Sequence, residues 1–262
     1  MFLARVSYQS EVHYAVVEGL DAIGDTTPLT EFHFLQEHPL ITGIRTTGVI
    51  KRLDEVKILV PLIPTKVIGI GKNYADHAKE MGGEVPAEPI CFLKPTTALI
   101  AEDDAIRLPR QSSHVEHESE LAVIISKTAR NVSKGEAMDY VFGYSVANDV
   151  TARDIQKTDG QWTRAKGFDT FLPLGPWIQT DFDYKKGFVE AKVNGVVKQH
   201  ASLDLMVHDV ETLVSWCSES MTLLPGDVIL TGTPAGVSPI RAGDEVECFI
   251  PGVGRLVNTV VG

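Results

Sequence analysis

Short runs in which polar and apolar residues alternate dominate this chain, and they predict strands more often than helices. Two such runs open the sequence, Phe2–Tyr8 and Val12–Glu18, with only polar residues at 9–11 between them. The stretch 24–48 scatters Thr, Pro and Gly between short apolar groups. We expect the first runs to form strands and residues 24–48 to be irregular.

A domain boundary is indicated where Pro61 and Pro64 interrupt the chain before the next strand-like run. No internal repeat or low-complexity tract is present. We therefore expect a small β-rich N-terminal domain over residues 1–58 and a second domain over residues 59–262.

The second domain is also rich in strand patterns. Two pairs of runs flank turn sequences typical of hairpins, Asn194-Gly195 and Pro251–Gly254. The predicted strands are Lys66–Gly71, Ile90–Lys94, Glu118–Ser126, Tyr140–Asp149, Phe188–Val193, Val196–Gln199, Glu245–Ile250 and Arg255–Val261.

Helix signals are fewer. Ser133 and Glu136 have the spacing of a capping box, and Asp209 is placed to cap a helix that runs through Ser218, with apolar residues on one face. Strands follow one another without regular β–α alternation, which argues against dinucleotide-binding and TIM-barrel folds. We predict an α+β protein that is predominantly β.

Composition and charge narrow the class of protein. The 262 residues include 24 Lys+Arg and 35 Asp+Glu, a net charge of −11, which disfavours nucleic-acid or anionic-membrane binding. No apolar run has the length of a membrane span, and no secretory signal is evident. The three cysteines are widely spaced and lie mostly among apolar residues, as expected for free thiols in a reducing compartment. We expect a cytoplasmic protein.

Acidic residues at every second position mark one predicted strand. Glu116, Glu118 and Glu120 would share one face of it, opposite a face formed by Leu121, Val123 and Ile125. Such a row is either a solvated acidic surface or a set of oxygen ligands of the kind that Mg²⁺, Mn²⁺ or Ca²⁺ prefers. Asp149 ends another apolar strand, where it is either a further ligand or the cap of a following helix.

Seven blocks of the sequence, in order, resemble the fumarylacetoacetate hydrolase family, and most closely its short branch of acylpyruvate hydrolases and oxaloacetate decarboxylases. The resemblance covers about residues 66–262, and the first 58 residues resemble the small N-terminal domain that some members carry. The blocks are Gly71–Glu80, Phe92–Pro95, Glu118–Leu121, Asn148–Gln156, Trp162–Phe168, Leu224–Asp227 and Thr231–Gly236.

The resemblance implies a mixed β-roll fold and a set of site residues. A divalent cation, Mg²⁺ or Mn²⁺, would be held by Glu118, Glu120 and Asp149, with Glu116 as a bystander. His77 and Glu80 would form an acid/base pair, and Lys166 would face cation and substrate. The residues that would bind the keto-acid end are Arg153, Gln156, Gly232 and Thr233.

These parts suit hydrolysis of a carbon–carbon bond in a small 2,4-dioxo acid, such as an acylpyruvate or fumarylpyruvate, through an enolate that the cation stabilises. His77 would deprotonate water, with Glu80 orienting it. Alternatives are oxaloacetate decarboxylation, isomerisation of 2-hydroxyhepta-2,4-diene-1,7-dioate as in aromatic catabolism, and non-catalytic binding of a keto acid and metal. Without the resemblance, His77 and Lys166 would be read as ordinary surface residues.

Four further expectations concern partners, motion and single residues. Relatives form homodimers, so we expect a homodimer that binds a small anionic 2-oxo acid. Residues 82–89 combine Gly and Pro next to His77 and Glu80, and are either an ordinary loop or a lid over bound substrate. Lys72 stands where many relatives have Arg; a basic side chain remains, but a bidentate grip on a carboxylate is lost if that was the role of the Arg. Trp162 and Trp177 are read as packing residues.

Overall fold

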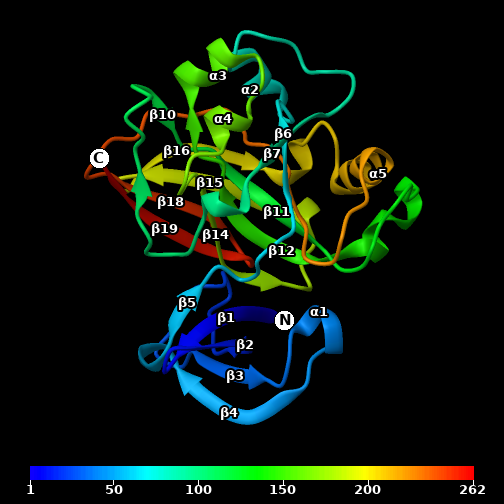
Figure 1. The fold of residues 1–262 in the computed structure, drawn as a ribbon, viewed down its shortest axis with the longest axis vertical. Helices are drawn as coiled ribbons and strands as arrows, with labels where there is room; N and C mark the ends of the chain where they lie inside the picture. Colours follow the sequence, from blue (N-terminus) through cyan, green and yellow to red (C-terminus); the bar gives the residue numbers. More distant parts are fainter.

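The largest sheet of the protein joins its N-terminal strands to the strands of its larger part. The computed structural model describes all residues from 1 to 262. In Figure 1 strands β1 to β5 form one end of the molecule, and helices α2, α3 and α4 gather at the opposite end. The main path of this sheet is β4 (Thr46–Arg52), β3 (Glu31–Leu35), β2 (Glu11–Glu18), β1 (Phe2–Tyr8), β14 (Leu172–Gln179), β12 (Val141–Asn148), β11 (Ser119–Ile125), β17 (Val228–Leu230), β6 (Val67–Gly71) and β7 (Ile90–Lys94), with β5 (Lys57–Leu59) paired to β1 and β8 (Leu99–Ile100) paired to β14.

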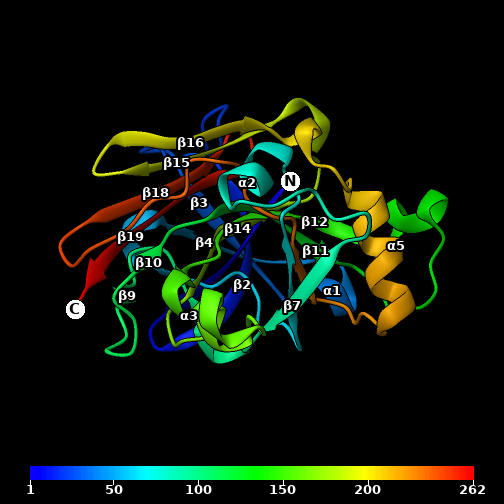
Figure 2. The same cartoon turned by 90° about the horizontal axis from the view of Figure 1, so that it is seen from above.

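Two smaller sheets and a few short helices complete the fold. Figure 2 shows the second sheet at one side, with α5 at the other. The second sheet has the order β16 (Val196–Ser202), β15 (Phe188–Val193), β18 (Glu245–Ile250), β19 (Gly254–Val261) and β9 (Ile106–Arg107), and the third pairs β10 (Val115–Glu116) with β13 (Thr151–Ala152). The α-helices are α1 (Pro39–Thr42), α2 (Ala75–Glu80), α3 (Arg153–Asp159), α4 (Thr163–Lys166) and α5 (Val210–Ser220), and the 3-10 helices are η1 (Leu53–Glu55), η2 (Thr96–Ala98), η3 (Lys134–Tyr140), η4 (Tyr184–Lys186) and η5 (Leu203–Leu205).

The predominantly β, mixed-sheet fold confirms the predicted class, and both predicted hairpins form. Helix α5 begins where predicted, because Asp209 accepts a hydrogen bond from the backbone N–H of Thr212 at 2.9 Å. None of the helices has the length and apolarity that a membrane crossing requires. The three cysteines are free thiols, and two of them, Cys217 and Cys248, are buried.

Three sequence predictions are wrong. Residues 24–48 contain β3, α1 and the start of β4, since Phe32 and Phe34 alternate with polar residues and are buried. Ser133 does not cap a backbone N–H; its hydroxyl donates to the carboxylate of Glu136 at 2.5 Å, and a 3-10 helix follows.

The third error concerns the acidic row, which is not one strand. Glu116 belongs to β10, whereas β11 begins at Ser119. Between these strands, the backbone N–H of Glu118 donates to the side-chain oxygen Asn148 Oδ1 at 3.0 Å and not to a backbone carbonyl of a neighbouring strand. Every residue of β11 is buried, so neither of its faces is solvated.

The N-terminal strands share a core with the rest of the chain. Leu3 and Leu35 pack in one apolar cluster with Leu174 and Ile178 of β14. Trp177, also from β14, packs instead among N-terminal residues and is 2% exposed, as the packing role predicted for it requires. The predicted boundary at residues 58 and 59 falls within β5, and the division into two domains stays a prediction.

Candidate functional site

Three buried carboxylates lie together where β11 and β12 run side by side. Ser119 of β11 pairs with Asn148 of β12, and the Asp149 N–H donates to the Glu118 carbonyl at 2.8 Å, so Asp149 ends beside the start of β11. One oxygen from each of Glu118, Glu120 and Asp149 lies within 4.8 Å of the others. The structure therefore brings together the three residues for which a shared ligand role is predicted.

Two buried lysines and an arginine offset part of this negative charge. Lys166 Nζ, at the end of α4, donates to Glu118 at 2.7 Å and to Asp149 at 2.6 Å. Lys94, from β7, donates to the other oxygen of Asp149, and its side chain is 0% exposed. Burial alone would raise the pKa of Glu118, but the Lys166 and Arg153 cations outweigh burial and hold that pKa well below its usual range.

Glu120 is different, because no cationic side chain pairs with it. Its carboxylate accepts a hydrogen bond from the Gly232 N–H at 2.7 Å. Burial, reinforced by the charges of Asp149 and Glu118, raises the pKa of Glu120 well above its usual value. A buried carboxylate with uncompensated charge, next to two others, offers the hard oxygen donors that a divalent cation takes. The three residues thus fit a Mg²⁺ or Mn²⁺ site.

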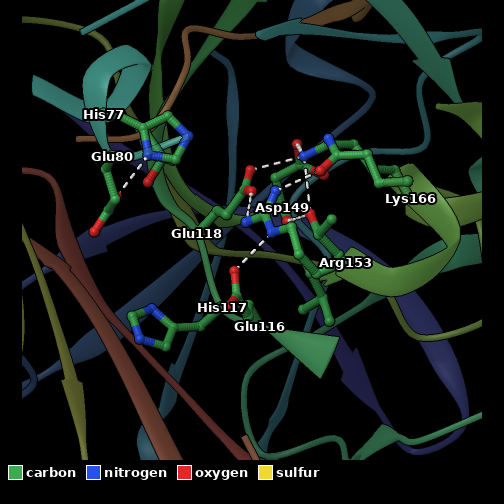
Figure 3. A network of polar contacts seen from close by, with 12 residues as sticks. His77, Glu80, Glu116, His117, Glu118, Asp149, Arg153 and Lys166 are labelled. Atoms are coloured by element: carbon green, nitrogen blue, oxygen red, sulfur yellow. Dashed lines mark hydrogen bonds and ion pairs between the residues drawn. The ribbon is translucent and has the colours of Figure 1, made fainter. Parts of the chain in front are cut away.

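The predicted acid/base pair forms on α2. His77 Nδ1 lies 3.0 Å from Glu80 Oε2, since residues three apart on a helix share a face. Glu80 Oε1 also accepts a hydrogen bond from the Gly236 N–H at 3.0 Å, which ties α2 to the loop after β17. His77 is 5% exposed and lines the same pocket as Glu118 and Glu120. In Figure 3 its ring lies beside Glu118.

The arginine of α3 is held on two sides. Arg153 Nε donates to Glu116 at 2.6 Å and one of its terminal nitrogens donates to Glu118; the other donates to Gln156 at 2.6 Å. Glu116 is therefore joined to the site through Arg153, as Figure 3 shows, and it lies outside the three-carboxylate cluster.

Of the two predicted substrate-binding residues in the loop after β17, Thr233 lines the pocket and Gly232 does not. The Thr233 hydroxyl donates to the Ser119 carbonyl at 2.9 Å and accepts from Gln199 at 2.7 Å. Gly232 donates its N–H to Glu120, so that N–H is engaged with the carboxylate cluster. Burial lowers the pKa of His117 to about 4, and its ring contacts Gln199 at 3.1 Å behind Thr233.

A pocket of about 170 Å³ opens in front of these groups. It also includes Lys72, which stands where many relatives have Arg, and Lys157, which no sequence pattern marks as a site residue. Trp162, predicted to pack, both lines the pocket and contacts the Phe92 ring edge-on, with centroids 5.7 Å apart. The lining residues are Ile70, Gly71, Lys72, His77, Met81, Glu118, Glu120, Arg153, Gln156, Lys157, Trp162, Lys166 and Thr233.

The chain is similar to known proteins along its whole length. Residues 66–261 match the family model of the fumarylacetoacetate (FAA) hydrolase C-terminal domain, and residues 1–61 match the Rv2993c-like N-terminal domain. It is 48% identical to protein Rv2993c of Mycobacterium tuberculosis, over 100% of this chain and 98% of that protein. It is 40% identical to the mitochondrial oxaloacetate tautomerase FAHD2A of Bos taurus, over 92% of this chain and 83% of that protein.

Solved structures show the same fold. A crystal structure described as 5-carboxymethyl-2-hydroxymuconate delta-isomerase from Mycobacterium smegmatis aligns with a TM-score of 0.92 at 44% identity, over 100% of this chain and 99% of that one. A maleylpyruvate hydrolase from Sphingobium sp. SYK-6, in complex with manganese(II) and pyruvate, aligns with a TM-score of 0.79 at 29% identity, over 100% and 99%.

Proposed function

Because the chain belongs to the fumarylacetoacetate hydrolase family, we propose that it is an enzyme that moves a proton at the carbon next to the keto group of a small 2-oxo acid, with a divalent cation at Glu118, Glu120 and Asp149. One observation carries this proposal: His77, paired with Glu80, lines the same pocket as the three-carboxylate cluster. A base beside a cation site is the arrangement that enolisation requires.

Each residue has a part in the proposed reaction. The cation, when bound, would polarise the keto group and so make the neighbouring C–H bond more acidic. His77 takes the C3 proton and returns a proton to oxygen, or the reverse, and Glu80 orients the ring and offsets the imidazolium charge. Lys166 supplies a fixed positive charge beside the oxygen on which charge develops. Arg153, Gln156 and Thr233 hold the 2-oxo acid end.

Keto–enol tautomerisation or a related isomerisation is the leading reaction. Relatives named as an oxaloacetate tautomerase and a muconate isomerase cover most of the chain at 40% and 44% identity. The pocket volume of about 170 Å³ also suits a small acid, since a cavity of about 150 Å³ holds benzene.

Carbon–carbon bond hydrolysis is the second candidate, favoured by the same His77–Glu80 pair and by the relative described as a maleylpyruvate hydrolase. His77 would take a proton from water, and the hydroxide would add to the C4 keto carbon. The C3–C4 bond would then break with its electron pair left on C3, and the proton would return there. Decarboxylation of oxaloacetate needs no general base and is a third possibility in the same pocket.

Turnover measurements separate these reactions. We would follow the keto–enol exchange of oxaloacetate, its decarboxylation, and the loss of acetylpyruvate and fumarylpyruvate, each with Mg²⁺, Mn²⁺ or EDTA. We expect keto–enol exchange that EDTA abolishes. Loss of a dioxo acid faster than the exchange of oxaloacetate would instead establish hydrolysis. Stabilisation by oxalate plus Mg²⁺ without any turnover would identify a binding protein and overturn the proposal.

Replacing the base tests its role. His77→Asn is expected to lower exchange or hydrolysis about 10²- to 10⁴-fold while cation binding persists, and to affect decarboxylation much less. His200→Asn is the matched control, because that histidine is exposed, pairs with Glu190 and lies outside the pocket. Equal loss of all activities in His77→Asn would contradict the assignment.

We also propose that the protein forms a homodimer. Dimerisation is expected from the resemblance to the family, and sedimentation velocity tests it directly. A monomer at micromolar concentration would contradict it.

A further inference from the structure

Two of the four cationic side chains of the pocket have no carboxylate partner. Arg153 and Lys166 are buried, and each binds two carboxylates. Lys72 and Lys157 line the same pocket but form neither an ion pair nor a side-chain hydrogen bond. In a chain with 35 acidic and 24 basic residues, two unpaired ammonium groups at one pocket leave positive charge available to an anion.

The backbone holds Lys72 in a fixed and uncommon conformation. Its φ of 56° lies in the left-handed region, which residues with a Cβ adopt uncommonly. The next residue, Asn73, is fully buried and anchors the turn by donating to the Thr231 carbonyl at 2.7 Å and to the His208 carbonyl at 3.0 Å. The Lys72 ammonium lies against Gly83, where an added Cβ would be 2.9 Å from Nζ.

Lys157 approaches the pocket from α3. Arg153, Gln156 and Lys157 stand at positions i, i+3 and i+4 of this helix and so share one face. Along that face the side chains change from buried Arg153, through half-buried Gln156, to exposed Lys157. The buried end of the pocket, its floor, therefore carries the paired charges of Arg153 and Lys166, whereas the unpaired charges belong to half-buried Lys72 and exposed Lys157, nearer the mouth.

We propose that Lys72 and Lys157 bind a second carboxylate of the substrate, so that the enzyme selects small 2-oxo dicarboxylates over 2-oxo monocarboxylates. This inference rests on the proposed function, in which the 2-oxo acid end lies on the floor beside the carboxylate cluster. The distal carboxylate then lies at the mouth, between β6–α2 and α3, while the half-buried Trp162 and the apolar side chains of Ile70 and Met81 surround the carbon chain.

Binding of two unreactive ligands tests the inference without catalysis. Malate and 2-hydroxybutyrate both have four carbons and a 2-hydroxy acid end, but only malate has the distal carboxylate. In calorimetric titrations with Mg²⁺ present, we expect malate to bind about tenfold more tightly, as one charge-assisted contact at a partly exposed site provides. Lys72→Met and Lys157→Met should each reduce this ratio, and the double variant should bring it to about one.

Lys79→Met is the matched control, because that lysine lies on α2, pairs with Asp76 and does not line the pocket. It should leave the ratio unchanged. Equal binding of both ligands to the unaltered protein, no binding of either, or a preference that persists in the double variant would each overturn the inference.

Turnover provides the second readout and separates this inference from the proposed function. The ratio of kcat/KM for oxaloacetate to that for its 4-methyl ester should fall about tenfold or more in the double variant. If nothing is turned over but malate is preferred through the two lysines, the proposed reaction fails and the dicarboxylate site stands. If both compounds react with equal kcat/KM, the reaction stands and the dicarboxylate site fails.

Discussion

Glu116 and Arg153 form a buried ion pair, with Glu116 Oε2 2.6 Å from Arg153 Nε, although they belong to different elements. The pairing of β10 with β13 sets Glu116 opposite Thr151, two residues before Arg153, and so brings the two side chains together. Because Arg153 also donates to Glu118, the pair fixes the guanidinium plane beside the carboxylate cluster. Glu116 is thus a positioning residue for Arg153.

Removing the charge of Glu116 tests this role. Glu116→Gln should raise KM for a 2-oxo acid about tenfold with little change in kcat, since Arg153 would be held less firmly in its binding orientation. It should also cost about 1–3 kcal/mol of unfolding free energy, as expected for a buried charged group that loses a partner. Glu219→Gln, at an exposed position of α5, is the control. A loss confined to kcat would show that Glu116 acts in some other way.

Cation binding should stabilise the fold through Glu120. Mg²⁺ or Mn²⁺ at about 100 times its Kd should add about 2.7 kcal/mol to the free energy of unfolding, measured as a rise in Tm. In Glu120→Gln most of this rise should disappear, because the variant lacks a ligand. If Glu120→Gln and Glu219→Gln respond equally to the cation, the site lies elsewhere.

Replacing Lys94 should lower the free energy of unfolding more than replacing a lysine usually does. Lys94→Met leaves Asp149, which is 1% exposed, with only one of its two ammonium partners, so we expect a loss of about 3 kcal/mol in urea unfolding. Lys66→Met is a matched comparison, because its partner Asp227 is also buried but keeps hydrogen bonds from Thr65 and from the backbone N–H of Leu224. Similar losses in the two variants would contradict a special role for Lys94.

Glu102 should make stability depend on pH. It lies in a cleft of about 570 Å³ between the N-terminal strands and the larger part, and burial, with the charges of Asp103 and Asp25, raises its pKa to about 7. The pKa of Glu102 is higher in the folded protein than the ordinary value of 4.5. Its contribution to the free energy of unfolding is therefore fully present below pH 4.5 and is lost as the pH rises through 7.

Glu102→Gln should therefore be more stable than the unaltered protein by about 1 kcal/mol near pH 8, allowing for solvent screening of a half-buried group, and equally stable near pH 4. Chemical denaturation at the two pH values measures the difference. An advantage of the same size at both would mean that the effect is not titration of Glu102.

Residues 82–89, which connect α2 to β7 without regular structure, are predicted to close over bound substrate. Amide hydrogen exchange in this segment should slow on addition of oxalate with Mg²⁺, while exchange in η3 stays the same. Unchanged exchange in residues 82–89 would leave them as an ordinary loop.

Local patterns were the most informative part of the sequence. His77 and Glu80 are three residues apart on one helix, so their contact follows from spacing once the helix forms. The hairpin at Asn194-Gly195 is specified by its own turn residues in the same way. Contacts between distant segments were harder to foresee: Lys94 reaches Asp149 from 55 positions away, and nothing in the pattern around Lys157 marks it as a pocket residue.

The pairing of β1 with β14 has a consequence for any shortened form of the protein. Phe2 and Leu3 cover Gln179 and Ile178 of β14, and the N-terminal strands also bury Trp177. A chain that began after β5 would leave the edge of β14 unpaired at Ile178 and Gln179 and would expose this indole ring. An unpaired strand edge of this kind can pair with the same edge of another molecule, which leads to aggregation. The N-terminal strands therefore protect the rest of the protein from its own copies.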